Sequence, residues 1–213
     1  KNSGTEAIIN LLEARINVLE KSLMNSLSTS IYSDGTGSSG KEVGGLQLIV
    51  ADAGTGTVGG INSSTYTFWQ NQQTTATSSA FSVANVQSDM NTMYLSLVRG
   101  SDSPTLIMAG TNAYTAFLGS LQAIQRITSD DMARSGFTSL QYLNSDVVFD
   151  SACNTNRMYF LNTDYLRLEV AASRDFVPGE AKMSVNQDAM VTPMFWSGNL
   201  TCSNRALQGV IHT

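Results

Sequence analysis

The chain begins with the stretch 5–30, TEAIINLLEARINVLEKSLMNSLSTS, which contains neither glycine nor proline. Its large apolar residues recur at spacings of three and four, which places them on one face of an α-helix. This apolar stripe covers little more than two heptads, fewer than a free-standing coiled coil usually needs. We therefore expect a long helix whose stripe is buried against the strands of the terminal segment, so that truncating Leu19 to alanine costs about 2–5 kcal/mol. The residues of the stripe are Ile9, Leu12, Ile16, Leu19 and Leu23.

The composition narrows the class of protein. A chain of 213 residues can bury a proper core in one or two domains. Only 14% of its residues are charged, against a typical ~25%. Two interpretations stay open: much of the surface becomes interface, or the protein is rich in β-structure with neutral polar faces. The net charge of −5 and the lack of clustered Lys and Arg argue against a nucleic-acid-binding surface.

The first residues, the apolar runs and the cysteines of the sequence indicate the cellular environment of the chain. No segment approaches the ~18 consecutive apolar residues of a membrane span, and the first residues lack the apolar region of a signal peptide. We therefore expect neither membrane association nor export. The sequence starts directly before the helix and without methionine, from which we expect that the natural protein has an upstream portion. Cys153 and Cys202 are far apart, and we expect buried free thiols rather than a disulfide.

The pattern of elements after the long helix predicts a mixed fold. The apolar run 46–50 within a glycine-, serine- and threonine-rich stretch is expected to be a strand, as is 66–69, while 70–79 reads as a polar connector. Because the later strands need a partner sheet, we expect them to pair with 46–50, which makes the middle of the chain an insertion. Amphipathic helices are predicted over 86–98 and 111–124, and strands at 105–109, 147–149, 158–161, 166–170 and along 190–211.

A glycine pattern offers the one candidate cofactor site. Gly54, Gly56 and Gly59 form a literal G-x-G-x-x-G, the fingerprint of dinucleotide binding when a helix begins at its end. The residues that follow are typical of a turn and a strand, so we expect a mobile loop or hairpin that binds nothing. A nucleotide-dependent enzyme that uses this loop is the alternative from another functional class.

Residues for acid–base or metal chemistry are few. The only histidine, His212, is the penultimate residue and is expected to be frayed. Asp130 and Asp131 form an adjacent pair without further ligands, which favours a solvated loop or a helix cap. Asp34 resembles the start of a calcium loop, but the later ligand positions are missing, so we expect a turn. We assign no catalytic, cofactor-binding or metal-ligating residue.

The order of these elements resembles that of the major capsid protein of tailed bacteriophages, the Hong Kong ninety-seven-type fold. The likeness spans most of the chain, and no single stretch is specific; their joint order carries it. The stretches are IYSDGTG at 31–37, GLQLIV at 45–50, TVGGI at 57–61 with FWQN at 68–71, and WSGNL at 196–200.

The resemblance implies an α+β fold in which the opening helix is the spine helix of a peripheral domain. The peripheral domain would comprise 1–84 and the returning strands 181–213, with an inserted axial domain at 85–180. The implied function is a non-enzymatic structural subunit of an icosahedral capsid, without cofactors, which forms hexamers and pentamers that enclose double-stranded DNA. The shell of a bacterial nanocompartment, which has the same fold, is the nearest alternative.

The resemblance also implies partners and a location. The partners are neighbouring copies, together with portal, scaffold or decoration proteins; packaged DNA is met only by non-specific proximity, and no membrane is involved. The location is the virion capsid, assembled in the cytoplasm of the bacterial host. Family members carry an N-terminal arm and an extended loop before the spine helix, and this sequence shows neither. We therefore expect a stable plate that assembles poorly or only into small oligomers.

Overall fold

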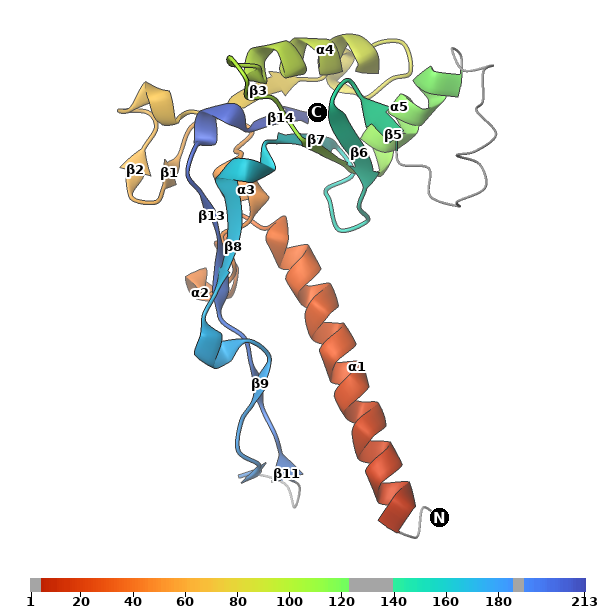
Figure 1. The fold of residues 1–213 in the computed structure, drawn as a ribbon, viewed down its shortest axis with the longest axis vertical. Helices are drawn as coiled ribbons and strands as arrows, with labels where there is room; N and C mark the ends of the chain where they lie inside the picture. The colour runs from red at the N-terminus through yellow and green to blue at the C-terminus, as the bar shows by residue number, and fades with distance from the viewer. Residues whose placement is uncertain (1–4, 123–139, 186–189) are drawn as a thin grey trace.

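A head and two long extensions make up the molecule. The computed structural model describes residues 5–122, 140–185 and 190–213, with side chains from Ala14 onward in the first helix. The head contains both helices and strands, and the two extensions leave it in the same direction (Figure 1). One extension is helix α1 (Thr5–Ile31), which confirms the predicted long helix, and the other is a two-stranded ribbon.

A six-stranded sheet forms the centre of the head, in the order β3-β14-β7-β4-β6-β5. β14 runs parallel to β3 and antiparallel to β7, and β4 runs parallel to β6 and antiparallel to β7. The sheet contains strands from 1–84, 85–180 and 181–213, and the division of the chain into two domains along these ranges stays a prediction. The strands are β3 (Gln72–Thr75), β4 (Leu106–Ala109), β5 (Leu140–Tyr142), β6 (Ser145–Phe149), β7 (Arg157–Leu161) and β14 (Gly209–His212).

Both faces of the sheet are buried, as the central strand β7 shows. Met158 and Phe160 belong to the core on the side of α4 and α5, whereas Tyr159 and Leu161 belong to the core on the side of α3. This alternation is the one that a β-strand imposes on successive side chains. Because apolar residues fill both sets of positions, β7 lies in the middle of the head rather than at its surface.

Helices α4 (Val86–Leu97) and α5 (Thr111–Gln122) pack on one face of the sheet. Their apolar periodicity predicts both helices, and both are confirmed. The helical period over 86–98 and 111–124 also places Val98, Leu118 and Ile124 on the apolar faces, but Val98 and Leu118 are more than one-third exposed, and Ile124 lies outside the described residues. The buried apolar side chains are Val86, Met90, Met93, Tyr94, Leu97, Ala113, Ala116 and Phe117.

The run 46–50 forms helix α3 (Leu46–Ile49), so the prediction of a strand there is wrong. Its buried side chains are Leu46, Ile49 and Val50, whose spacings of three and four fit one face of a helical turn. Four of the five residues in the run are apolar, so the sequence satisfies a helical and a strand period equally well. The later strands consequently do not pair with this run.

The ribbon begins beside the head with β8 (Leu166–Val170) and β13 (Gly198–Cys202), which pair antiparallel with Leu168 opposite Leu200. The predicted strand at 166–170 is thereby confirmed. The expected long β-segment over 190–211 is divided into four strands, of which only β14 enters the head sheet. The outer part of the ribbon pairs β9 (Val177–Pro178) with β12 (Met194–Phe195), and β10 (Lys182–Met183) with β11 (Met190–Val191).

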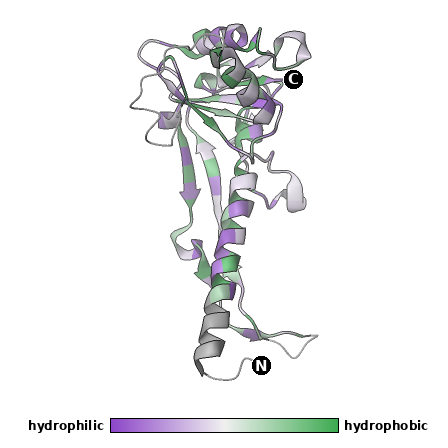
Figure 2. Cartoon of the chain, turned by 90° about the vertical axis from the view of Figure 1, so that its right-hand side faces the viewer, coloured by the Kyte–Doolittle hydropathy of each residue, from purple (hydrophilic) through white to green (hydrophobic). Residues whose placement is uncertain are grey.

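Helix α1 joins the head through its last turn. The Tyr32 hydroxyl donates to Asp150 Oδ2 over 2.7 Å, and the Tyr32 ring lies 6.2 Å from that of Tyr159. Gly45 packs so closely on the carbonyl of Ile31 that a side chain at this position would clash. Between Ala14 and Ile31, no residue before Ile31 belongs to either core cluster. The helix is therefore anchored at one end, and in the described part of the chain it leaves the head apart from the ribbon (Figure 1), while Figure 2 shows polar and apolar residues mixed along it.

A hairpin occupies the glycine-rich stretch after α3. Strands β1 (Thr57–Val58) and β2 (Ile61–Asn62) pair antiparallel around Gly59 and Gly60. Both glycines have positive φ, as a two-residue hairpin turn of the favoured kind requires. The remaining short turns are α2 (Gly37–Gly40), η2 (Thr77–Ser79), η3 (Thr163–Tyr165), η4 (Ala172–Arg174) and η5 (Arg205–Leu207).

Two predictions for the next segment are wrong. The expected strand at 66–69 is the 3-10 turn η1 (Thr67–Trp69), and the expected connector 70–79 contains strand β3. β3 has the sequence QQTT and lies at the edge of the sheet. Edge strands often carry polar residues on both faces, so hydrophobic alternation does not identify this one.

Arg205 is wholly buried and holds the loops of this region together. Its guanidinium donates to the carbonyl oxygen of Ile49, to Ser63 Oγ at 3.1 Å, to the Trp69 carbonyl at 3.4 Å and to the Thr55 carbonyl at 3.5 Å. Burial lowers the pKa of Arg205, but a guanidinium stays protonated in proteins. The neutral oxygens around it therefore replace the water that this charge has lost.

Replacing Arg205 with methionine should lower the free energy of unfolding by about 2–4 kcal/mol, because several buried oxygens lose their donor. The matched control is Arg167→Met, which changes an exposed arginine on the ribbon and should shift stability by less than about 0.5 kcal/mol. Urea denaturation monitored by tryptophan fluorescence measures both. Equal effects of the two variants would show that Arg205 does not organise the loops.

Candidate functional site

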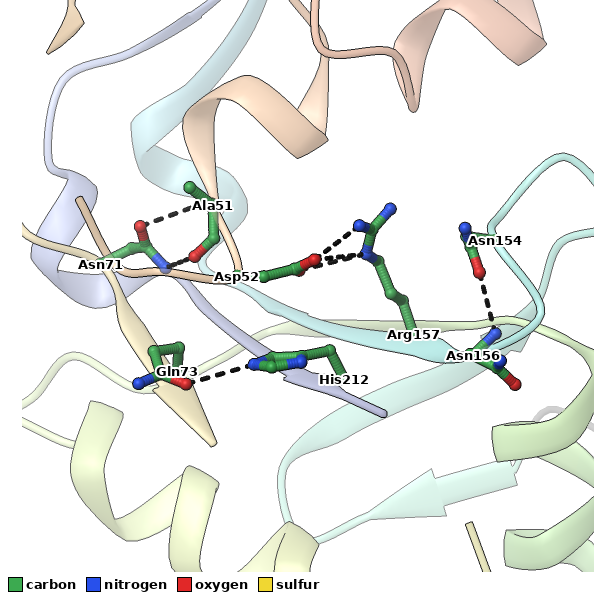
Figure 3. Close-up of polar contacts among 8 residues, drawn as sticks. All are labelled: Ala51, Asp52, Asn71, Gln73, Asn154, Asn156, Arg157 and His212. Carbon is green, nitrogen blue, oxygen red and sulfur yellow. Dashed lines mark hydrogen bonds and ion pairs between the residues drawn. The ribbon is translucent and has the colours of Figure 1, made fainter. Parts of the chain in front are cut away.

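Polar side chains gather where β7 and β14 meet the loop after α3 (Figure 3). Arg157 Nε lies 3.1 Å from Asp52 Oδ1 and its Nη2 lies 2.5 Å from Asp52 Oδ2, a bidentate ion pair. Burial opposes the charge on Arg157, but the hydrogen bond and charge of Asp52 outweigh it, so the pKa of Arg157 is raised. Both charges are satisfied by each other, and the pair ties the loop to β7.

His212 also belongs to this cluster, and the expectation that it is frayed is wrong. It lies in β14, between β3 and β7, where it faces Thr75 on one side and Arg157 on the other. His212 Nε2 lies 3.2 Å from Gln73 Oε1 (Figure 3), the one side-chain hydrogen bond of the ring in the described part of the chain. No Ser–His–Asp arrangement forms there. The backbone ladder orders this residue, which side-chain patterns near the end of a sequence do not reveal.

The G-x-G-x-x-G stretch lacks the geometry of a dinucleotide site. Gly54, Gly56 and Gly59 all have positive φ and lead into the β1–β2 hairpin. A pyrophosphate site would need a helix N-terminus directly after the third glycine, where the free amides and the dipole favour an anion. Of the two expected forms, a loop or a hairpin, the structure shows the hairpin, whereas the mobility of 54–60 and the absence of a bound nucleotide stay predictions.

The candidate carboxylates do not assemble into a metal site within the described residues. Asp34 Oδ1 accepts from Thr36 N at 3.0 Å and from Thr36 Oγ1 at 2.8 Å, which lowers the pKa of Asp34 and confirms the predicted turn. Asp130 and Asp131 lie outside the described residues. In 5–122, 140–185 and 190–213, no group of three or more His, Cys, Asp and Glu residues is placed to hold a metal ion.

Both cysteines are free thiols, as predicted. Cys153 is buried and Cys202 is partly buried. Burial raises the pKa of Cys153 to about 12 and that of Cys202 to about 11. Thiolate, the reactive form, is therefore scarce at neutral pH, which does not fit a catalytic nucleophile.

Exposed apolar side chains gather instead on the two extensions. Of the twenty large apolar residues exposed in the described part of the chain, eleven lie on α1 and the ribbon, which contribute little to either core. Such a concentration marks an interaction surface rather than the scattered apolar residues of an ordinary surface. These eleven are Ile16, Val18, Leu19 and Met24 on α1, and Leu168, Val177, Met183, Val185, Met190, Val191 and Phe195 on the ribbon.

The stripe on α1 is part of this surface, which corrects the prediction that it is buried within the chain. Ile16 is 42% exposed, Leu19 is 38% exposed and Leu23 is partly buried. The side chains of Ile9 and Leu12 lie outside the described residues. The helical period identifies the stripe, but α1 and the ribbon leave the head as separate extensions (Figure 1), so the described residues supply no layer that covers Ile16 and Leu19.

Two features of the structure, the burial of Arg205 and the outer ribbon, cannot be identified from sequence patterns. Arg205 is one of twelve basic residues, and nothing around it in the sequence distinguishes it as buried. The outer ribbon contains Val177, Met183 and Met190 in two-residue strands, too short for an alternation to be counted. The many apolar residues between 177 and 195 in a segment with several turns were the only available signal.

Comparisons with known proteins identify the fold. The structure is similar to a capsid protein of cyanophage A-1(L), with a TM-score of 0.65 and 16% sequence identity over 96% of this chain and 69% of the other. It is also similar to a phage-related protein from Bordetella bronchiseptica RB50, with a TM-score of 0.54 and 8% identity over 100% of this chain and 69% of the other. No family model and no curated protein matches the sequence.

A third similarity is weaker. A virus-like particle from Pyrococcus furiosus aligns with 67% of this chain and 54% of its own at 11% identity, and its TM-score of 0.41 is too low to support a shared fold. The first two comparisons suffice for one conclusion. The chain has a mixed helix and sheet structure that matches a phage capsid fold.

The chain should bind no nucleotide at the 54–60 loop. NAD and ATP at millimolar concentration are expected to leave its thermal unfolding midpoint unchanged, because the loop offers a hairpin turn and no helix N-terminus. Differential scanning fluorimetry measures this. A saturable rise in the midpoint that disappears in Gly56→Val would contradict the prediction and restore the alternative of a nucleotide-dependent enzyme.

The described helices also permit one statement about membranes. Within 5–122, 140–185 and 190–213, no helix combines the length and the apolar character that crossing a bilayer requires.

Proposed function

We propose that the chain is a structural subunit of an icosahedral bacteriophage capsid with the Hong Kong ninety-seven-type fold. Copies of it form hexamers and pentamers that enclose double-stranded DNA. The observation that carries this proposal is the fold shared with a cyanophage capsid protein over 96% of the chain. The role is structural rather than catalytic.

In this proposal α1 is the spine helix of a peripheral domain, to which the ribbon strands β10 to β13 within 181–213 also belong, while their partners β8 and β9 lie within 85–180. The head helices α4 and α5 with their strands correspond to the axial domain at 85–180. β14 connects the two, because it comes from outside that range and pairs with β7 inside it, while β3 pairs with β14 on the other side. This connection would make the subunit one rigid plate.

The extensions support a partner that is another copy. An isolated helix is marginal in water, and so is an isolated two-stranded hairpin, because neither buries enough apolar surface. The exposed apolar residues of α1 and the ribbon therefore need cover that the described chain does not supply. A shell in which every subunit borders several copies of itself supplies such cover without any other protein.

The charge distribution fits a shell that surrounds DNA without binding it. The chain has net charge −5 and only twelve Lys and Arg residues. A surface of this kind meets DNA by proximity alone, since phosphate binding needs clustered positive charge. Portal, scaffold or decoration proteins, the virion location and assembly in the host cytoplasm belong to the same proposal.

The proposal is tested by the association of the purified chain. Static light scattering across a concentration series should show oligomers whose mass rises with concentration, and negative-stain microscopy should show small oligomers rather than closed shells. A chain that stays monomeric up to millimolar concentration would contradict self-assembly. Closed shells formed by this chain alone would contradict the expectation of small oligomers.

Polar substitutions in the α1 stripe should weaken association and leave the subunit folded. For Ile16→Ser with Leu19→Ser we expect an association constant at least about tenfold lower, because both side chains are exposed in the single chain and would be covered by a neighbour. The unfolding midpoint of the monomer in urea should change little, since neither side chain belongs to the core clusters.

The matched control carries Asn17→Ser and Asn25→Ser, which replace exposed polar residues of the same helix. It should associate like the unmodified chain. If the stripe variant associates normally and instead unfolds at lower urea, the stripe is a core face of the single chain, as the sequence alone suggests.

A further inference from the structure

Two aromatic side chains protrude together from the loop that follows β2. Tyr66 is 53% exposed and Phe68 is 68% exposed, and their ring centroids lie 6.1 Å apart. Tyr66 and Phe68 are hereafter called the aromatic pair. Tyrosine and phenylalanine each remove about 150–250 Å² from water when they are covered, and aromatic anchors of this kind dominate interfaces.

The loop that carries the aromatic pair is braced on both sides. Tyr66 N donates to the Asn62 carbonyl at 2.9 Å, and Trp69 Nε1 donates to the Val58 carbonyl at 3.2 Å. Buried Arg205 holds Ser63 before the pair and the Trp69 carbonyl after it. An anchor fixed in this way loses little conformational freedom on binding, which is what makes an exposed aromatic group an effective contact.

The same head carries a groove between residues 79–83 and α5, of about 530 Å³. This volume is within the range of ~300–1,000 Å³ that holds small-molecule-sized groups. Phe81, Val83 and Ala116 give it apolar walls, and Asn112 and Ser82 add polar groups. Ser82 Oγ itself is buried behind this wall and has no hydrogen-bond partner among the described residues.

Charge favours a contact between these two places on separate copies. Two copies with net charge −5 repel each other, so they approach most easily through neutral surface. Residues 53–88 contain no Asp, Glu, Lys, Arg or His, and this tract includes both the aromatic pair and one wall of the groove. Residues 103–125, which contain the other wall on α5, are also free of these residues.

We propose that the aromatic pair of one copy inserts into the 79–83 groove of a second copy. Phe68 contacts Phe81 and Val83 there, with the Tyr66 ring beside it. The assignment of the partner as a second copy rests on the proposed shell function, and the contact adds the residues through which two heads meet.

The aromatic pair and the 79–83 groove are different surfaces of the same chain, so the proposed contact is heterologous. The β1–β2 hairpin lies at one end of the head and α5 lies at the other (Figure 1), with β3 running between them in sequence. One copy therefore cannot satisfy its own groove, and each copy offers a free anchor and a free groove. Heterologous contacts of this type close into rings when the rotation between copies allows it, and a capsomer is such a ring.

Disulfide trapping tests the geometry of the contact. Phe68→Cys in one preparation and Val83→Cys in another are mixed under mild oxidation, and we expect a cross-linked dimer in the mixture and none in either preparation alone. The unmodified chain, with its two native thiols, is the blank. A mixture of Leu95→Cys and Val83→Cys is the matched control, because Leu95 is 74% exposed on α4 but takes no part in the contact.

Association measurements complete the test. Tyr66→Ser with Phe68→Ser should lower the association constant at least about tenfold. Leu95→Ser with Leu143→Ser, at positions that are 74% and 66% exposed, should leave it unchanged. Both variants are checked for a native unfolding midpoint.

The outcomes separate this contact from the proposed function. Cross-linking only in the Phe68–Val83 mixture, together with weaker association of the aromatic variant, supports the contact. Normal association without that cross-link, or a cross-link in the Phe68→Cys preparation alone, overturns the contact and leaves the shell function standing. A chain that never associates overturns both.

Discussion

The structure depends on the burial of one cation, Arg205, which joins the end of the chain to loops that come 136–156 residues earlier in the sequence. Three residues later, Gln208 exchanges hydrogen bonds with the backbone of Asn162, and β14 then enters the sheet between β3 and β7. A buried guanidinium that loses one of its acceptor oxygens is strongly destabilised, so these oxygens must stay in place. The loops around the β1–β2 hairpin, the sheet and the exposed aromatic pair are therefore positioned together.

A second constraint is that the head buries most of its apolar side chains, whereas the two extensions leave many of theirs exposed. The head buries its own: both faces of the sheet are covered, one by α4 and α5 and the other by α3 and the anchored end of α1. The extensions do not, because a single helix and a two-stranded ribbon that leave the head separately cannot enclose a core. A subunit whose head has a buried core and whose extensions expose apolar side chains is suited to assembly. The similarity to a phage capsid fold is consistent with this.

The sequence predicts local structure best where a period repeats several times. α1, α4 and α5 are found within a few residues, and so are β4, β6, β7 and β8, because their apolar residues follow one period. The run 46–50 fits two periods at once, and β3 at the sheet edge carries no apolar signal, so both predictions are wrong. The stripe of α1 is correctly identified as apolar, but burial depends on a tertiary neighbour that periodicity does not encode. Arg205 and the aromatic pair depend on long-range contacts for the same reason.

Hydrogen–deuterium exchange of the amides, compared between dilute and associated chain, tests the central claim that the extensions are completed by other copies. The account predicts that amides of the head sheet are protected in both states. It predicts that amides of α1 from Ala14 to Ile31 and of β8 and β13 gain at least about tenfold protection on association. Equal protection of these segments in dilute and associated chain would contradict the account, because the extensions would then be stable without any neighbour.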